Sequence, residues 1–199
     1  MTVLSVSYIQ ELRRRTGAGI LQCKTTLDRV GGDLELATAE LRVRGAVALE
    51  DRIERPTSEG LIASYVHHNG KLGVLIEVNC ETDFVARTEE FRTLVRHLAE
   101  QVAGAAPIAV TRNAIPAETI AQRRRAFEDE VRATRKPAPL AARIVDGKME
   151  AYFRSVVLMD QAWVREPKVT IAELVRQAAV WSGENIQVRR FARFHMGIA

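Results

Sequence analysis

Two β-type runs separated by a turn signal constrain the fold of this chain more than any other feature. Leu61–His68 comes first, Asn69-Gly70 follows, and Lys71–Cys80 alternates strongly between apolar and polar residues. Asn and Gly both tolerate the positive φ angles of a two-residue type I′ turn, so the pattern predicts a β-hairpin. The face of the return strand that we expect to lie against the core carries Val74, Ile76 and Val78.

An acid and an aromatic residue, Asp83 and Phe84, follow directly after the second run, within Glu81–Ala86. A helix-like pattern begins at Thr88, so we expect a loop to present both side chains. Structure alone does not require an aromatic residue beside an aspartate in a loop. The pair suggests an apolar wedge, delivered together with a charge and aimed at a partner.

The first 45 residues have the periodicity of three short helices. Their apolar faces include Leu12 in the first helix and Cys23 in the second, and Asp33 is placed to cap the third. Gly45 is the expected end of the third helix. A unit this small has only a marginal core, which is typical of a docking module.

The remainder of the chain predicts mainly helices. One apolar stripe follows the helical period in Thr88–Ala103. An antiparallel helical pair is expected from two further segments, Pro116–Thr134 and Leu140–Val157. Thr170–Trp181 opens with a capping box, and 185–194 resembles a strand whose alternation slips at Arg189-Arg190, as a bulge would explain. A hairpin, helices and one late strand predict an α+β fold with a small antiparallel sheet.

We expect three parts along the chain. Residues 1–45 form the three-helix domain, and 46–60 form a charged linker in which Pro56 disfavours helix continuation. Residues 61–199 form the α+β core.

Composition limits the class of protein. The sequence has no run of about 18 apolar residues, and its start lacks a secretory signal, so we expect neither a membrane span nor secretion. Cys23 and Cys80 lack metal-ligand spacing and indicate buried free thiols in a reducing cytoplasm. The net charge of +4 comes from interspersed residues of both signs, and does not by itself make a nucleic-acid groove.

Several motifs with chemical potential favour ordinary interpretations. Gly17-Ala18-Gly19 follows a helix and lacks the Gly-Lys-Ser/Thr ending of a phosphate loop. His67-His68, if on a strand, point to opposite faces and do not easily share a metal ion. Asp83 has no orienting partner nearby in sequence to make it a general base. We therefore expect no covalent chemistry, no cofactor and no metal site.

Three arginine clusters leave RNA binding open as an alternative: Arg13–Arg15, Arg123–Arg125 and Arg189-Arg190. Arginines on amphipathic helices usually form solvated faces or local ion pairs, and few aromatic residues interleave these clusters for base stacking. We therefore expect no direct nucleic-acid contact.

Four segments in order resemble the elongation factor Ts family. Leu12–Ile20, followed by Cys23-Lys24 and Leu27, resembles its N-terminal signature. The other three segments resemble its sheet hairpin, its second signature and its closing strand, and they are Ser64–Leu75, Glu77–Arg87 and Gly183–Phe191. Each segment is specific, and together they cover most of the chain.

The resemblance implies a guanine-nucleotide exchange factor for elongation factor Tu. It implies that residues 1–45 resemble a ubiquitin-associated domain that docks on the G domain of Tu, and that the core presents Asp83 and Phe84 to the same domain. Phe84 is then the wedge, inserted beside the Mg²⁺ and phosphate site. The residues expected to contact the partner are Thr82, Asp83, Phe84, Val85, Arg13, Lys24 and His67.

The length is similar to that of the short bacterial form of the family, which implies a homodimer that engages two Tu molecules. Ala192 stands where many short members carry a cysteine, so no disulfide between subunits forms there. The segment 46–56 departs from the Lys- and Ala-rich pattern of the family. A non-catalytic docking adaptor and an RNA- or ribosome-binding protein are the alternatives to the exchange factor.

Overall fold

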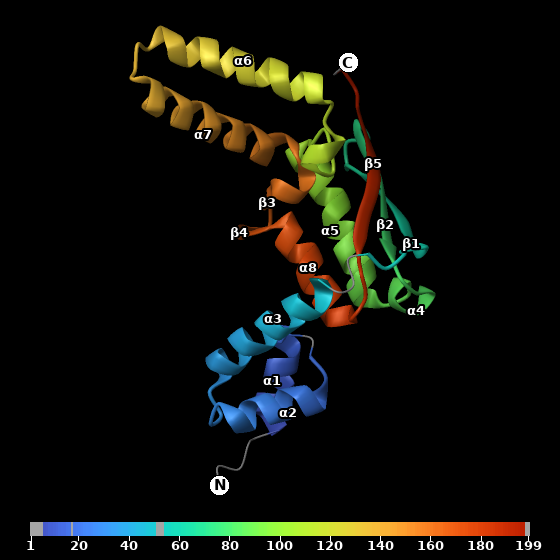
Figure 1. Cartoon of the computed structure of the whole chain (residues 1–199). Helices are drawn as coiled ribbons and strands as arrows, with labels where there is room; N and C mark the ends of the chain where they lie inside the picture. The colour runs from blue at the N-terminus through green and yellow to red at the C-terminus, as the bar shows by residue number, and fades with distance from the viewer. Residues whose placement is uncertain (1–5, 17, 51–53, 198–199) are drawn as a thin grey trace. The chain divides into compact units, whose positions relative to one another are not determined.

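A computed structural model describes residues 6–16, 18–50 and 54–197 of the chain (Figure 1). Gly17 and residues 51–53 of the expected linker therefore lie outside the described residues. The fold is α+β, as predicted, with helices and a small antiparallel sheet. In the described ranges, no helix has both the length and the apolar character needed to cross a membrane.

The chain divides into two compact units, each assembled from separate stretches of sequence. One unit contains the residues up to Ile62 together with Glu77–Val95 and Glu173–Val188. The other contains Ala63–Ile76, Arg96–Ala172 and the residues from Arg189 onward.

Three helices form the N-terminal part: α1 (Val6–Thr16), α2 (Ile20–Arg29) and α3 (Leu34–Glu50). They enclose a small apolar cluster of buried residues, which are Leu12, Cys23, Leu27, Ala37 and Leu41. This confirms the predicted positions of Leu12 and Cys23 on the apolar faces of their helices. The Asp33 carboxylate accepts hydrogen bonds of 2.9 Å from the backbone N–H groups of Glu35 and Leu36, and so caps α3 as expected.

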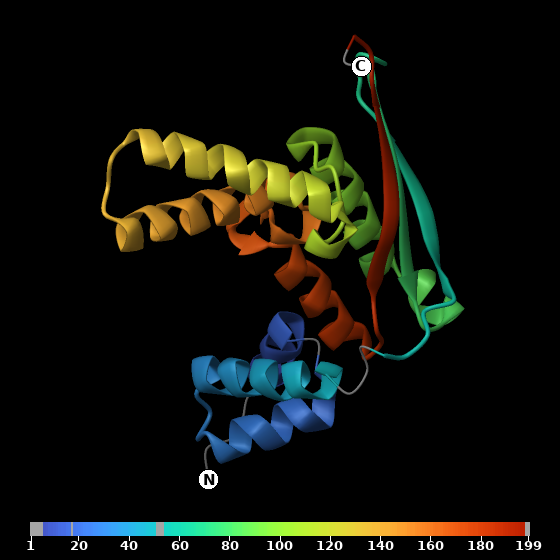
Figure 2. The ribbon, with the colours of Figure 1, turned by 45° about the horizontal axis from the view of Figure 1, so that its top comes forward.

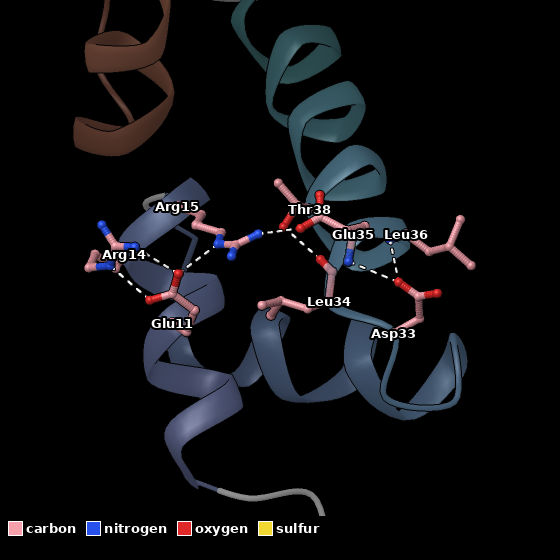
Figure 3. A network of polar contacts seen from close by, with 8 residues as sticks. All are labelled: Glu11, Arg14, Arg15, Asp33, Leu34, Glu35, Leu36 and Thr38. Atoms are coloured by element: carbon pink, nitrogen blue, oxygen red, sulfur yellow. Dashed lines mark hydrogen bonds and ion pairs between the residues drawn. The ribbon is translucent and has the colours of Figure 1, made fainter.

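Polar contacts join α1 to α3 across this small core (Figure 3). Arg15 donates to Glu11 on its own helix and to Glu35 at the start of α3, at 2.7 and 2.5 Å. Hydrogen bonds from Arg14 and Arg15 lower the pKa of Glu11 to about 2. Two arginines of the first cluster thus form local ion pairs, as is usual for arginines on a helix surface.

Helix α3 does not end at Gly45 as predicted, but continues to Glu50. A glycine near the end of a helical pattern costs only about 1 kcal/mol inside a helix, so the following Ala46-Val47-Ala48-Leu49 can continue it. The boundary expected at residue 45 therefore falls within a helix.

The main sheet has three strands in the order β1 (Glu59–Val66), β2 (Leu72–Cys80) and β5 (Gln187–His195). Val74, Ile76 and Val78 are all buried, which confirms the predicted core face. The burial pattern of β5 slips at the predicted place, where Arg189 and Arg190 are both exposed.

The hairpin turn is wider than the predicted two-residue type. Gly70 N–H donates to the His67 carbonyl, so the central residues of the turn are His68 and Asn69. Gly70 alone has the positive φ, 67°, whereas Asn69 does not. A turn followed by a left-handed glycine is the next most common way to join two twisted strands.

Helix α5 (Glu89–Ala105) runs along the sheet in both views (Figures 1 and 2). The predicted apolar stripe is confirmed by five buried residues, which are Phe91, Leu94, Val95, Leu98 and Val102. At the C-terminal end of the helix, Arg193 of β5 donates to the Ala103 carbonyl at 3.3 Å.

The predicted helical pair consists of α6 (Ala117–Ala133) and α7 (Ala138–Val156), which lie side by side in both views (Figures 1 and 2). At its base, Arg112 donates to the carboxylates of Glu150 and Asp160 and lies over the Phe153 ring. Arg112 belongs to the 3-10 helix η1 (Arg112–Ala114), and Asp160 to η2 (Leu158–Asp160).

A short second sheet was not predicted from the sequence. Strands β3 (Ala162–Trp163) and β4 (Glu166–Thr170) pair in antiparallel fashion ahead of α8 (Ile171–Ser182). The buried amide of Gln101 holds this hairpin by donating to the Ala162 carbonyl and accepting from Val164 N–H. β3 is too short to show alternation, and β4 has the sequence Glu-Pro-Lys-Val-Thr, which does not alternate between apolar and polar residues.

Candidate interaction site

The predicted wedge residues lie on one turn of helix rather than in a loop. Helix α4 (Asp83–Ala86) begins directly after β2, and its backbone bonds join Ala86 N–H to Thr82 O and Arg87 N–H to Asp83 O. Thr82 caps this turn, because its hydroxyl accepts from Val85 N–H at 3.5 Å. We call Thr82–Arg87 the α4 turn. The expectation of a loop at this position was therefore wrong.

The α4 turn presents a large apolar side chain to solvent. The Phe84 residue is 79% exposed, whereas Ala86 is buried and anchors the turn. Asp83 pairs with Arg87 at 2.8 Å, and because Arg87 is largely exposed and Asp83 partly exposed, this ion pair contributes little to stability. The structure thus brings Thr82, Asp83, Phe84 and Val85 together in one small, projecting element.

A carboxylate from a segment far away in sequence holds the beginning of this turn. The Glu184 carboxylate accepts three hydrogen bonds, from Glu81 N–H and Thr82 N–H at 3.0 Å and from the Thr82 hydroxyl at 2.6 Å. In return, the Glu81 carboxylate accepts from Asn185 N–H at 2.7 Å. We call these contacts the Glu184 network. Sequence reasoning missed Glu184, because a glutamate after a helix-ending glycine gives no signal of a distant partner.

Cys80, the last residue of β2, lies beneath the same turn. Its thiol is fully buried and donates to the Thr82 carbonyl at 3.2 Å. Burial, and then the negative charge of Glu184, raises the pKa of this thiol to about 11. Cys23 is also buried and free.

We expect Cys80 to resist alkylation in the native protein. At pH 8 a thiol of pKa 11 is only about 0.1% thiolate, so iodoacetamide should react roughly 100-fold more slowly than after unfolding. The stabilisation linked to this proton is complete below the ordinary pKa of 9.0 and is lost as the pH rises through about 11. Mass spectrometry of the labelled peptides measures the rate, and complete labelling of native Cys80 within minutes would contradict the buried position.

The remaining predicted residues are not part of the α4 turn. Arg13 and Lys24 are exposed on α1 and α2. His67 lies at the hairpin turn, in the other compact unit, where its Nδ1 is 2.9 Å from the Tyr65 hydroxyl.

The geometry of His67 and His68 differs from the prediction. Both residues follow the end of β1, and their ring centroids are 4.2 Å apart, so they do not point to opposite faces. Within the described part of the chain, no group of three or more His, Cys, Asp or Glu side chains is placed to hold a metal ion.

Comparison of the sequence with known proteins shows the family to which this chain belongs. The family model described as Elongation factor TS matches residues 42–198. The Elongation factor Ts of Anaeromyxobacter dehalogenans is 45% identical over 197 residues, which are 99% of this chain and 90% of that protein.

Two further relatives cover nearly all of both chains. The Elongation factor Ts of Coprothermobacter proteolyticus is 44% identical over 194 residues, 98% of each chain. That of Thermotoga petrophila is 43% identical over 194 residues, which are 98% of this chain and 96% of that protein. The resemblance drawn from the four sequence segments is therefore confirmed, and this chain belongs to the elongation factor Ts family.

Proposed function

We propose that this protein is the guanine-nucleotide exchange factor for elongation factor Tu, acting during translation elongation in the cytoplasm. Membership of the elongation factor Ts family supports this role. The structural observation that carries the proposal is the α4 turn, in which Phe84 is 79% exposed beside Asp83. A large aromatic side chain presented on a capped and anchored turn is suited to serve as the anchor of an interface, where aromatic residues carry much of the binding energy.

The proposed mechanism needs no covalent step. Mg²⁺ in the nucleotide site of Tu requires nearly ideal octahedral geometry and helps to hold the phosphates of GDP. Insertion of Phe84 and Asp83 beside this site displaces the surrounding elements of the G domain and weakens GDP binding. By linkage, GDP must weaken the binding of this protein by the same factor. The protein itself supplies no cofactor, metal or catalytic nucleophile in this scheme.

The N-terminal helices complete the proposed docking surface. We propose that residues 1–45 act as a module similar to a ubiquitin-associated domain, joined by residues 46–60 to a core formed by 61–199. The exposed side chains of Arg13 and Lys24 support contact with the G domain, and His67 is proposed as a third contact. Contact with nucleic acid has no part in this mechanism.

The main sheet supports the proposal of a homodimer. The exposed apolar residues on its strands include Val66 on β1, Leu75 on β2 and Phe194 on β5, which are 68%, 48% and 69% exposed. Exposed apolar residues on a sheet supply the kind of surface that a second copy can cover.

Introducing a charge on this surface is expected to separate the dimer. Burying an aspartate at position 194 without a partner costs several kcal/mol, so Phe194→Asp should weaken dimerisation by about 100-fold or more. Sedimentation equilibrium measures the effect, and Val164→Asp, which changes an exposed residue away from the main sheet, is the matched control. A dimer of unchanged strength in Phe194→Asp would exclude this surface.

Release of a fluorescent GDP analogue from elongation factor Tu tests the main proposal. Excess unlabelled GDP prevents rebinding, and the release rate is followed as this protein is added. A large acceleration that saturates with concentration supports exchange. Binding to Tu without acceleration would favour a docking adaptor, and strongly salt-dependent binding to RNA would favour an RNA-binding protein.

A further inference from the structure

The Glu184 network acts on the one residue that caps the α4 turn. Thr82 makes two hydrogen bonds to Glu184, one from its backbone N–H and one from its hydroxyl. Because the hydroxyl proton is directed to Glu184, an oxygen lone pair is left to accept from Val85 N–H. Glu184 therefore sets the orientation in which Thr82 caps the helix.

The α4 turn has few other sources of order. It is a helix of four residues, far shorter than a helix that is stable by itself. Phe84 is held by little packing because it is largely exposed, and the Asp83–Arg87 pair is too exposed to fix the turn. The turn is otherwise held by buried Ala86, by its own few backbone bonds and by the bond from the Cys80 thiol to the Thr82 carbonyl. The three hydrogen bonds that converge on the Glu184 carboxylate add a hold from a distant segment of the chain.

The same network ties the turn to the end of α8 and the approach to β5. Glu184 follows Gly183, whose φ of 74° ends α8, and precedes Asn185, which is itself buried. Asn185 N–H donates to Glu81, and its side-chain amide donates to the Arg55 carbonyl. Glu184 thus accepts from the backbone of the α4 segment, and Glu81 accepts from the backbone of the segment that leads into β5. These reciprocal bonds fix the separation and register of the two segments.

We propose that Glu184 is a positioning residue for nucleotide exchange. It holds the α4 turn in the conformation that directs Phe84 and Asp83 outward, so a complex already docked through other contacts need not order the turn before the wedge inserts. It does so without touching nucleotide or partner itself. This inference rests on the proposed exchange function, and it adds a residue outside the segment that carries the wedge.

Glu184→Gln is the most informative change. A glutamine can keep one acceptor oxygen for the two backbone N–H groups of Glu81 and Thr82. Its NH₂ group then replaces the oxygen that accepts from the Thr82 hydroxyl, so this hydroxyl must turn from donor to acceptor and the charge is lost. Glu100→Gln is the matched control, since Glu100 is a partly buried carboxylate in an ion pair with Arg165. Thr82→Val removes the hydroxyl end of the same contact with little change of shape.

Two measurements on the full-length protein test the proposal. The first is fluorescent GDP release from elongation factor Tu, with the maximal rate and the half-saturating concentration determined separately. The second is amide hydrogen exchange of the free variant, which needs no partner and reports on the peptide containing residues 81–88.

We expect Glu184→Gln to lower the maximal release rate about tenfold, which corresponds to about 1.4 kcal/mol, with little change in half-saturation. Amide exchange should rise in residues 81–88 and stay unchanged in α1–α3. In Glu184→Gln/Thr82→Val, the loss of rate should be smaller than the product of the single losses, because both act through one contact. Glu100→Gln should behave like the wild type in both measurements.

Other outcomes would overturn the proposal. A maximal rate equal to that of wild type, or a loss that Glu100→Gln shares, would mean that Glu184 does not position the wedge. Faster amide exchange throughout the chain would assign Glu184 a general role in stability. If the wild type itself failed to accelerate release, the exchange function would fail, and local amide exchange in Glu184→Gln would still show whether Glu184 holds the turn.

Discussion

Phe84→Ala is expected to abolish most of the exchange activity while leaving the fold intact. The side chain is 79% exposed, so its removal creates no cavity in the protein itself. If it inserts into elongation factor Tu, its loss removes a buried aromatic anchor, for which truncation typically costs about 2 kcal/mol or more. That cost corresponds to a fall of roughly 30-fold in the stimulated rate of GDP release.

Stopped-flow fluorescence of the released GDP analogue measures this loss, and thermal unfolding of the variant tests the fold. Ile108→Ala serves as the matched control because Ile108 is also a large, exposed apolar residue, 60% exposed, but lies outside the α4 turn. Equal losses in both variants would point to a general effect of surface apolar groups. Wild-type rates in Phe84→Ala would show that the wedge lies elsewhere.

Gly60→Ala is expected to destabilise the protein strongly. Gly60 has a φ of 149°, and a Cβ atom there would lie 2.3 Å from the Val78 carbonyl oxygen and 2.7 Å from the Asn79 Cα. These neighbours are backbone atoms of β2, which cannot move without disturbing the strand. Backbone strain and steric overlap together predict a loss of about 3 kcal/mol or more in the free energy of unfolding.

Chemical denaturation measures this loss, and Gly147→Ala provides a control of opposite sign. Gly147 is exposed within α7, and a Cβ there meets nothing within 4 Å. Alanine in a helix interior should raise the free energy of unfolding by about 0.5–1 kcal/mol. Similar effects from both substitutions would mean that the strand geometry at Gly60 tolerates a side chain.

The spacing of apolar residues correctly predicted the elements that are long enough to show a helical or strand period. The alternation in β2 identified Val74, Ile76 and Val78, and the 3.6-residue spacing in α5 identified Phe91 and Leu98, all of which are buried. Burial of one face follows directly from such spacing, because each element must cover its apolar side. The resemblance to the elongation factor Ts family came from sequence alone, and comparison confirmed the family.

The sequence also located Asp83 and Phe84 but not the structure that presents them. A four-residue helix is too short to show a helical period, so the α4 turn was predicted as a loop. The sequence patterns also missed the continuation of α3 beyond Gly45 and the two-residue strand β3. The reason is related: propensity and pattern are weak over a few residues, and contacts with neighbouring elements decide the local structure.

Only the tertiary structure revealed what holds the proposed wedge. Glu184 and Thr82 are 102 positions apart in the chain, and their contact exists because the segment leading into β5 lies beside the end of β2. Hydrogen bonds of this kind depend on strand order and register, which no local pattern contains. The sequence by itself thus determined which side chains form the periodic apolar faces and which segments are characteristic of the family. The tertiary structure decided which distant carboxylate bonds to the beginning of the α4 turn.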